Sequence, residues 1–386
     1  MLEGAKASGI RHVTTLTLGV GIATLFALLS LFAHAPFAAG EPEDSGPSPR
    51  IVNGKGTSIT EWPWQVALTD RALAPGGSTT DRYFCTGALI APNLVVTAAH
   101  CVESYRPGGL KGLRVITGRT WLDRTSTGES LGVSRIVMAL DSNGKRRYRD
   151  QNSAPIWDVA LIVLASPSSA TPLAIAGESE RAAWNPGRLV TTAGWGETRA
   201  FTGAISNRLR VATQVVLPDG VCRRDGGPFY RPKTMICHGG PEGNSSSCAG
   251  DSGGPLVSPV GGGWRLIGLT SFGDAACRGN VPSVDNRTAA DPVRSWVQGK
   301  AIELSGYDPV SEGGEVGPLP PSCKVPNLLR RTRASAKRAI RAAGCRLKAI
   351  RSIGRPSRGK RRVVGASLPA GWLAPRGFGV TVLLQR

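Results

Sequence analysis

The sequence predicts a mainly β protein, an all-β barrel or sandwich, followed by a small basic α+β module. From residue 51 to about residue 290, short apolar and β-branched runs alternate with Gly, Pro, Asn and Asp, which is typical of many short strands joined by turns. A Gly/Pro-rich stretch then ends this pattern. Beyond it, residues 316–386 contain 17 lysines and arginines and no acid, in a chain of net charge +20. This change in charge predicts a domain boundary and an anionic partner for the last part.

The first forty residues have the layout of a secretory signal peptide. A basic start precedes an apolar run from Val13 to Ala33, and small residues follow up to Gly40. We therefore expect residues 1–40 to be removed, with cleavage after Gly40, and the rest of the chain to be secreted. An uncleaved membrane anchor is the alternative, because the apolar run is about as long as a membrane span requires.

The expected strands follow one another along the chain after residue 51. A helix is expected at 291–304, with Pro292 at an early helical position, and a Gly/Pro-rich linker at 305–320. A second helix is expected after Thr332 as N-cap and before Gly344. The strand-like runs are WQVALTD, GALIAPNLVVTAAH, LRVITG, VALIVLA, RLVTTAGWG and WRLIGLTSFG before the linker, and RLKAIR, RRVVGAS and GVTVLL after it.

The cysteines indicate an oxidising compartment. Their number is even and no CxxC pair occurs, so four disulfides are favoured over a zinc site. Spacing alone does not give their connectivity. The eight cysteines are Cys85, Cys101, Cys222, Cys237, Cys248, Cys277, Cys323 and Cys345.

Three separate segments supply the residue types of a nucleophilic hydrolase. TAAHC contains His100, WDVALI contains Asp158, and GDSGGP contains Ser252. Together with RIVNG at 50–54, these motifs resemble the trypsin/chymotrypsin family of serine proteases, over about residues 51–304. The resemblance implies two six-stranded antiparallel barrels and a secreted serine endopeptidase. The order His, Asp, Ser is the order of this family, which disfavours a lipase or esterase of another fold.

The resemblance also implies a role for each residue of the site. Ser252 would attack the substrate, His100 would take its proton, and Asp158 would hold the imidazole in the right tautomer. The backbone N–H groups of Gly250 and Ser252 would form the oxyanion hole, and a side chain at position 250 would obstruct the approach of the substrate carbonyl.

A zymogen cleavage site is implied between Arg50 and Ile51. The new ammonium group of Ile51 would pair with Asp251, so residues 41–50 would be a propeptide that another, activating protease removes. The family pattern further implies that three disulfides lie within residues 51–304. These disulfides would join Cys85 to Cys101, Cys222 to Cys237, and Cys248 to Cys277.

The implied specificity pocket lacks an acid at its floor. In this family the residue six before the nucleophile forms the floor, which is Ser246 here, and the walls would include Gly273 and Ser283. We therefore predict an apolar or medium-sized P1 side chain: Leu, Met, Phe or Tyr. Asp285 stands where the family commonly has tyrosine, which leaves a basic P1 as the alternative. Ser271 would support both the substrate backbone and Asp158.

Residues 321–386 resemble a PASTA domain. The resemblance lies in VPNL at 325–328, the helix that ends in AAGC, and SLPAG before the last strand, while LLRRT departs from the pattern. It implies a disulfide between Cys323 and Cys345 and binding to peptidoglycan, and so retention at the cell wall. The alternative is that the arginines only solvate the surface. We see no motif for reading nucleic acid, so no nucleic-acid partner is expected.

The sequence leaves two function classes open. The first is an active endopeptidase that acts on protein or peptide substrates as a monomer. The second is a catalytically idle protease fold that serves as a scaffold or adhesin and binds peptidoglycan. Retention of all three triad residues favours the enzyme. We expect no cofactor and no metal, because no acidic cluster has convincing ligand spacing.

Overall fold

The computed structural model describes residues 54–149, 153–354 and 361–385. The expected signal peptide, the propeptide and the Arg50–Ile51 bond therefore lie outside the described residues. Within those residues, no helix is long and apolar enough to cross a membrane.

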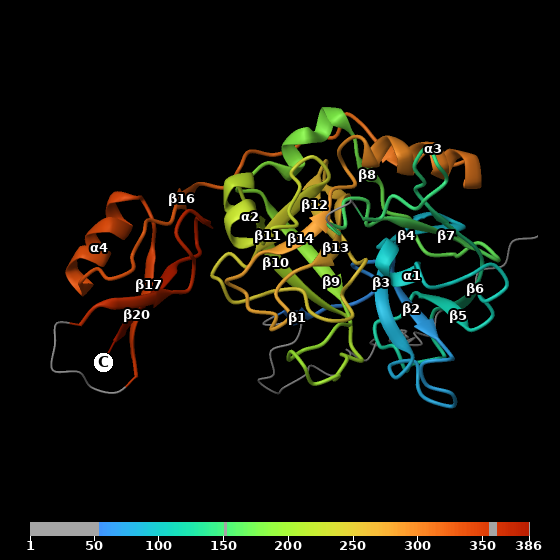
Figure 1. Cartoon of the computed structure of the whole chain (residues 1–386), viewed down its shortest axis with the longest axis horizontal. Helices are drawn as coiled ribbons and strands as arrows, with labels where there is room; N and C mark the ends of the chain where they lie inside the picture. The colour runs from blue at the N-terminus through green and yellow to red at the C-terminus, as the bar shows by residue number, and fades with distance from the viewer. Residues whose placement is uncertain (1–53, 150–152, 355–360, 386) are drawn as a thin grey trace, which may run out of the picture. The chain divides into compact units, whose positions relative to one another are not determined.

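Six antiparallel strands close the first barrel, drawn in blue to green in Figure 1. Around the barrel their order is β2-β3-β4-β7-β6-β5. β2, β4 and β7 are buried along almost their whole length, because one face fills the barrel and the other packs against neighbouring elements. The bounds are β2 Gln65–Asp70, β3 Tyr83–Ala91, β4 Leu94–Thr97, β5 Leu113–Thr117, β6 Glu129–Met138 and β7 Ala160–Leu164.

Six further antiparallel strands form the second barrel. β12 pairs with both β9 and β13, and this double pairing closes the ring β9-β10-β11-β14-β13-β12. The short strand β1 (Lys55–Gly56) pairs with β10 from outside the ring. The bounds are β9 Leu189–Gly194, β10 Arg210–Val216, β11 Met235–Gly239, β12 Pro255–Val260, β13 Gly263–Phe272 and β14 Ser283–Asn286.

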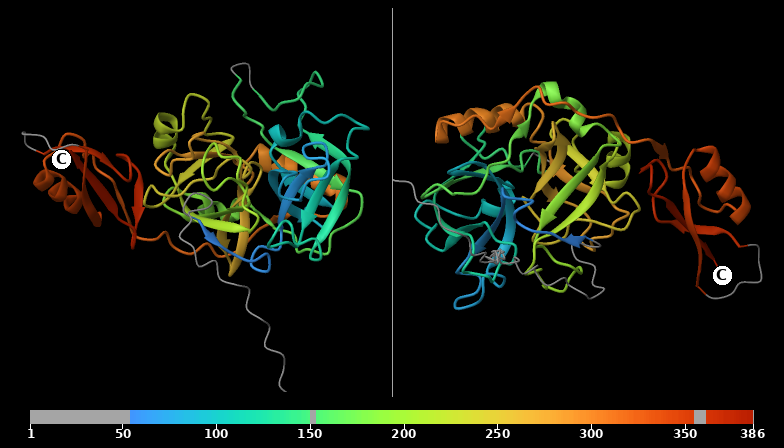
Figure 2. Two further views of the ribbon diagram at one scale, coloured as in Figure 1. Left: turned by 90° about the horizontal axis from the view of Figure 1, so that it is seen from below. Right: turned by 180° about the vertical axis from the view of Figure 1, so that it is seen from behind.

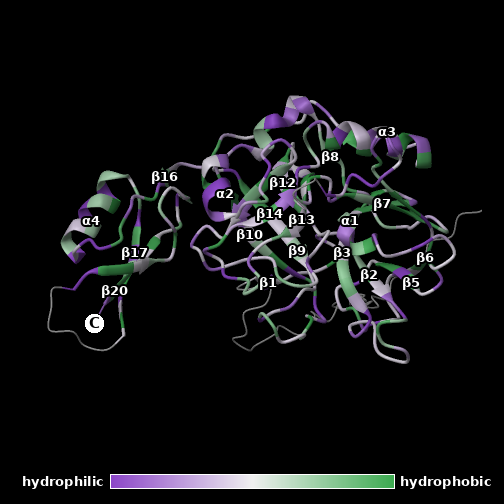
Figure 3. Ribbon diagram, viewed as in Figure 1, coloured by the Kyte–Doolittle hydropathy of each residue, from purple (hydrophilic) through white to green (hydrophobic). Residues whose placement is uncertain are grey.

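The two barrels pack against each other, as the three views in Figures 1 and 2 show. One cluster of buried residues includes Leu89 and Leu161 of the first barrel and Val257 and Leu269 of the second. In Figure 3 the hydrophobic residues gather in strands such as β7. Two six-stranded antiparallel barrels were expected from the family resemblance, and this expectation is confirmed.

Short helices connect and follow the barrels. They are α1 (Ala99–Val102), the 3₁₀ helix η1 (Glu178–Trp184), α2 (Asp219–Asp225) and α3 (Val293–Ser305). The expected helix at 291–304 is present as α3, but Pro292 caps it from outside instead of lying in its first turn.

The segment 305–320 differs from a structureless linker. It contains β15 (Val310–Ser311), which pairs in parallel with β8 (Ile175–Ala176). The carboxylate of Glu312 also accepts hydrogen bonds from the backbone N–H groups of Glu178 and Ser179, each at 2.9 Å. The first part of this Gly/Pro-rich segment therefore extends the protease domain.

The last part of the chain contains the helix α4 (Arg333–Ala342) and short strands. The Thr332 hydroxyl accepts a hydrogen bond from the Ser335 N–H at 3.2 Å, and Gly344 has φ +70°, so both predicted caps are confirmed. α4 buries Ala336 and Ile340, and in Figure 3 it carries both hydrophobic and hydrophilic residues. The strands are β16 Ser322–Lys324, β17 Leu347–Ile353, β18 Val363–Ala366, β19 Leu373–Pro375 and β20 Val380–Gln385.

All eight cysteines form disulfides. The pairs are those that the two resemblances implied, and the prediction of four disulfides is confirmed. They are Cys85–Cys101, Cys222–Cys237, Cys248–Cys277 and Cys323–Cys345.

Candidate active site

Strand pairing in the first barrel brings His100 and Asp158 together. His100 follows β4 in the short helix α1, and Asp158 stands two residues before β7. β4 and β7 are antiparallel neighbours, with Thr97 opposite Ala160, so the end of one strand meets the start of the other. His100 Nδ1 lies 2.8 Å from Asp158 Oδ2, and the His100 backbone N–H donates to Asp158 Oδ1 at 2.9 Å.

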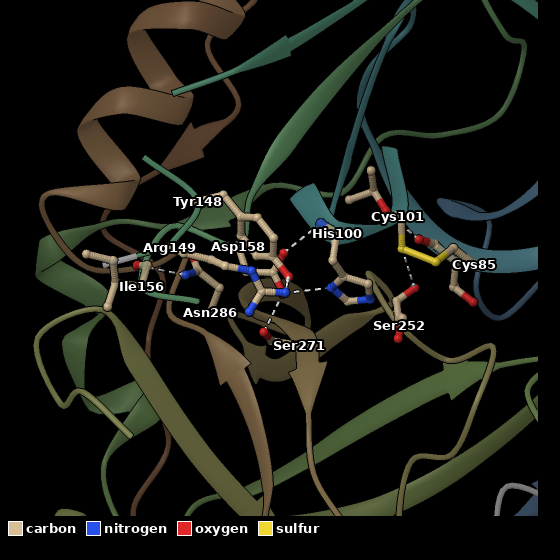
Figure 4. Close-up of polar contacts among 12 residues, drawn as sticks. Cys85, His100, Cys101, Tyr148, Arg149, Ile156, Asp158, Ser252, Ser271 and Asn286 are labelled. Carbon is tan, nitrogen blue, oxygen red and sulfur yellow. Dashed lines mark hydrogen bonds and ion pairs between the residues drawn. A yellow bond between two sulfur atoms is a disulfide. The ribbon is translucent and has the colours of Figure 1, made fainter. Parts of the chain in front are cut away.

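Asp158 is buried and fully hydrogen-bonded. Its side chain is 1% exposed, it lies between the buried residues Trp157 and Val159, and the Ser271 hydroxyl donates a further bond to Oδ2. A carboxylate that faces Nδ1 fixes the tautomer in which Nδ1 carries a proton and Nε2 is free to accept one. Figure 4 shows this chain of contacts from Ser271 through Asp158 to His100.

The carboxylate also changes the basicity of His100. Burial is the largest single effect and disfavours the charged imidazolium, and Arg149 acts in the same direction. The charge of Asp158, the hydrogen bond to it and the charge of Glu103 act in the opposite direction. The net result is that the pKa of His100 is raised above its ordinary value of 6.5. The imidazole is therefore a stronger base than a free histidine side chain.

Ser252 lies on the loop before β12 in the second barrel. The Thr86 N–H of the first barrel donates to the Ser252 carbonyl at 2.8 Å, which ties the loop to the opposite barrel. In Figure 4 the His100 ring lies between Asp158 and Ser252. Among the described residues, the Ser252 hydroxyl has no hydrogen-bond partner, so it is free to turn toward the base or a substrate.

The backbone of Gly250 gives a reason for glycine in addition to the expected one. Its φ is +91°, a conformation that other L residues rarely adopt. A Cβ here would lie 3.0 Å from the Tyr83 ring, 3.1 Å from Gly196 Cα and 3.2 Å from Ile205 Cδ1. A side chain at this position would therefore be strained and tightly packed against the protein itself. The Gly250 carbonyl accepts hydrogen bonds from Tyr83 Oη at 2.6 Å and Thr86 Oγ1 at 3.0 Å, which fixes the orientation of the loop.

Asp251 points away from Ser252 into the interior. Its carboxylate accepts bonds from the backbone N–H groups of Gly196 and Cys248, each at 2.9 Å. Burial raises the pKa of Asp251 to about 6, although the two N–H groups act in the opposite direction. No lysine or arginine of the described residues forms an ion pair with it, and its expected partner Ile51 lies outside them.

A cavity of about 290 Å³ opens beside Ser252. Ser271, Gly273 and Ser283 line it, as expected for the pocket. Ser246, the expected floor, is buried behind the lining, with its hydroxyl 3.3 Å from that of Ser283. The full lining is Glu197, Phe201, Ser247, Cys248, Ala249, Ser252, Thr270, Ser271, Phe272, Gly273, Asp274, Ala275, Cys277 and Ser283.

Sequence reasoning missed three features near this cavity. Glu197 and Phe201 line it, although no motif singled them out. His238 is the third: its Nε2 lies 3.0 Å from Oδ1 of Asp285, and both side chains are fully buried on the neighbouring strands β11 and β14. Asp285 is therefore bound to a histidine and is not among the residues that line the cavity.

One group of potential metal ligands occurs among the described residues. It consists of Cys85, His100 and Cys101, whose ligand atoms lie within 4.8 Å of one another. The two cysteines are joined in a disulfide and have no thiolate to offer a metal ion. This group therefore does not fit a metal site.

Comparison with known proteins agrees with the fold. The family model described as Trypsin matches residues 51–297. A curated relative named Trypsin, from Saccharopolyspora erythraea, is 33% identical over 240 residues, which cover 62% of this chain and 94% of the relative. A match over this length, together with the two barrels, establishes the family and, in general terms, the class of enzyme. The chain therefore belongs to the trypsin family and is a serine endopeptidase of the trypsin type.

Proposed function

We propose that the protein cleaves peptide bonds through His100, Asp158 and Ser252. Ser252 Oγ attacks the substrate carbonyl carbon while His100 Nε2 takes its proton. His100 then returns this proton to the leaving amine, and an acyl-enzyme remains on Ser252. Water, activated by the same imidazole, releases the acid and restores the serine. The observation that carries this proposal is the double hydrogen bond from His100 to buried Asp158.

The oxyanion hole in this proposal consists of the N–H groups of Gly250 and Ser252. These donors would stabilise the negative charge that develops on the substrate carbonyl oxygen. Because they are already oriented by the fold, they need not reorganise during the reaction. Tyr83 and Thr86 both donate hydrogen bonds to the Gly250 carbonyl. These bonds fix the Gly250–Asp251 peptide group, which lies between the two donors in the chain, and so support this assignment.

We further propose that the protein is made as a zymogen. Burial raises the pKa of Asp251. No cation among the described residues pairs with its carboxylate, and an ammonium group at Ile51 would supply one. Cleavage after Arg50 would release this ammonium group. We therefore expect a precursor with Arg50→Gln, if it remains uncut, to hydrolyse peptide substrates far more slowly than the cleaved protein.

Labelling with a fluorophosphonate probe tests the nucleophile and the switch together. The secreted protein is labelled before and after limited trypsin treatment, with Ser252→Ala as the control. Labelling only after cleavage at Arg50 supports both proposals. A protein that begins at Ile51 and does not label would favour the alternative, an idle scaffold or adhesin.

We propose an apolar or medium-sized P1 preference, namely Leu, Met, Phe or Tyr. Gly273 leaves the cavity open, and the Ser246 and Ser283 hydroxyls bond to each other in place of an acid. Asp285 contacts His238 through Oδ1 and is not among the described residues that line the cavity, which argues against the basic alternative. Amide substrates with P1 Phe, Leu, Ala and Arg decide between them, and a dominant rate for Arg would contradict the proposal.

We also propose secretion and retention at the cell wall by a PASTA-like module at 321–386. The signal-like start and the disulfides support secretion, and 17 cations without an acid in 316–386 support an anionic polymer as partner. The Ser252→Ala protein should sediment with peptidoglycan at moderate salt, and a chain that ends at residue 320 should not. Equal sedimentation of the two would refute retention by this module.

A further inference from the structure

The segment 197–205 carries an acid and an aromatic side chain to the edge of the substrate cavity. It follows β9 and folds back on itself, with Glu197 and Ile205 opposite each other in an isolated β-bridge. The Glu197 N–H donates to the carbonyl of Ala249 at 2.7 Å, directly before Gly250. The segment is thus attached to the loop that bears the nucleophile.

Glu197 is a buried acid with one oxygen left over. Glu197 is 8% exposed, and its Oε1 accepts a hydrogen bond from the Gly203 N–H at 3.0 Å, which fixes the carboxylate in place. Oε2 is buried and has no hydrogen-bond partner among the described residues. A buried carboxylate oxygen without a donor is costly, so its presence beside a cavity indicates a ligand that supplies the donor.

The charges of the cavity wall favour a cationic ligand. Two acids, Glu197 and Asp274, line the cavity, and its lining includes no lysine or arginine. Asp274 is already neutralised by Arg278, whose Nε lies 2.6 Å from its carboxylate. Glu197 has no such partner among the described residues, so it is the acid that remains to bind a substrate cation.

Phe201 adds an exposed aromatic surface to the same cavity. It is 78% exposed and adopts φ +61°, which is unusual and unfavourable for a bulky residue. Strained conformations of this kind gather at ligand-binding positions, where the rest of the structure maintains them. A ring face beside an acid is a suitable environment for a planar cation, because a guanidinium can stack on the ring while it donates to the carboxylate.

We propose that Glu197 and Phe201 form a subsite for an arginine side chain of the substrate, next to the P1 residue. This inference rests on the proposed endopeptidase activity and names part of its substrate class. Lysine fits less well, because its ammonium group is not planar and does not stack in the same way. The preferred substrates therefore have an apolar P1 residue and an arginine nearby.

Peptides with P1 Phe, in which Arg, Lys, Gln or Glu is scanned over the positions on both sides of the scissile bond, test the proposal. The readout is the ratio of kcat/KM for Arg to that for Gln at each position, within one enzyme. We expect Arg to be favoured about tenfold or more at one position, since a charge-assisted hydrogen bond replaces an unmet one. The preference should fall as salt is raised.

Variants of Glu197 and Phe201 test whether these two side chains, and not the overall charge of the protein, cause the preference for arginine. Glu197→Gln should bring the ratio close to one at that position, and Phe201→Ala should lower it by a factor of several. The matched controls Glu315→Gln and Phe229→Ala change residues outside the cavity lining, so they should leave the ratio of kcat/KM for Arg to that for Gln unchanged. A ratio near one at every position, or a ratio that survives Glu197→Gln, would overturn the subsite.

A short anilide substrate with P1 Phe and no arginine distinguishes failure of the subsite proposal from failure of the proposed peptidase function. If the cleaved wild-type protein hydrolyses the anilide but shows no preference for arginine, the subsite is wrong and the protease assignment stands. If it hydrolyses neither the anilide nor the peptides, both proposals are wrong.

Discussion

The two barrels each bring a buried aspartate to the site, and the two aspartates differ in their partners. Asp158, from the first barrel, accepts bonds from the His100 backbone, the His100 ring and Ser271. Asp251, from the second barrel, has two backbone N–H donors, and burial raises its pKa to about 6. The first barrel therefore presents a complete acid–base pair. The second holds an acid that needs a cation from elsewhere.

The largest effect on activity is expected when the pair of His100 and Asp158 is broken. Asp158→Asn should lower kcat by about 10⁴-fold, the scale of loss for this change in serine protease triads, because an amide no longer favours the productive tautomer. Steady-state hydrolysis of an anilide by protein that begins at Ile51 measures it. A loss below about tenfold would show that Asp158 does not orient His100.

The uncut precursor should lose stability as the pH rises from about 4 to about 6. The folded pKa of Asp251 is raised from 3.8 to about 6, so the folded state keeps a proton that the unfolded state releases in this window. The cost of ionising the buried acid is on the order of 2–3 kcal/mol and is fully present above pH 6. An Ile51 ammonium group would remove this cost from the cleaved protein.

Urea unfolding of cleaved and uncut Ser252→Ala protein, at pH 4 and pH 7, measures the difference. We expect the free energy of unfolding of the cleaved form to increase relative to that of the uncut form as the pH rises. Asp251→Asn should abolish this relative increase. A gap between the two forms that does not change with pH would mean that Asp251 does not receive the new N-terminus.

The acid limb of kcat/KM should lie above pH 6.5, because the reaction needs neutral His100 and the pKa of this side chain is raised. In Asp158→Asn the limb should move to lower pH, since burial, which disfavours the imidazolium, is then no longer outweighed. A limb at the same pH in both proteins would contradict the role of the Asp158 charge.

The smallest effect is expected at Ser271. Ser271→Ala removes one of three hydrogen bonds to Asp158 and leaves both bonds from His100, so we expect about a tenfold loss of kcat/KM or less. The same anilide assay measures it. A loss as large as that of Asp158→Asn would mean that the serine, and not the first barrel alone, holds the aspartate.

The sequence by itself determined the features that depend on local chemistry. Short runs between turn residues predicted the strands, Thr332 and Gly344 predicted the ends of a helix, and an even cysteine count predicted four disulfides. Three motifs in order predicted the proposed triad, because they match the motifs and the order of the trypsin/chymotrypsin family. The turn, cap and motif signals each lie within a few neighbouring residues, whereas the cysteine count and the order of the motifs are properties of the whole sequence.

Only the tertiary structure decided which atoms are left without partners and what surrounds each position. Gly250 is constrained by Tyr83, Gly196 and Ile205, which lie far from it in the sequence. Glu197 became a candidate only because Oε2 is buried, without a donor among the described residues, beside the cavity. Burial and hydrogen bonding are properties of the whole packed chain, so a residue without a motif around it gives no local sign of its role.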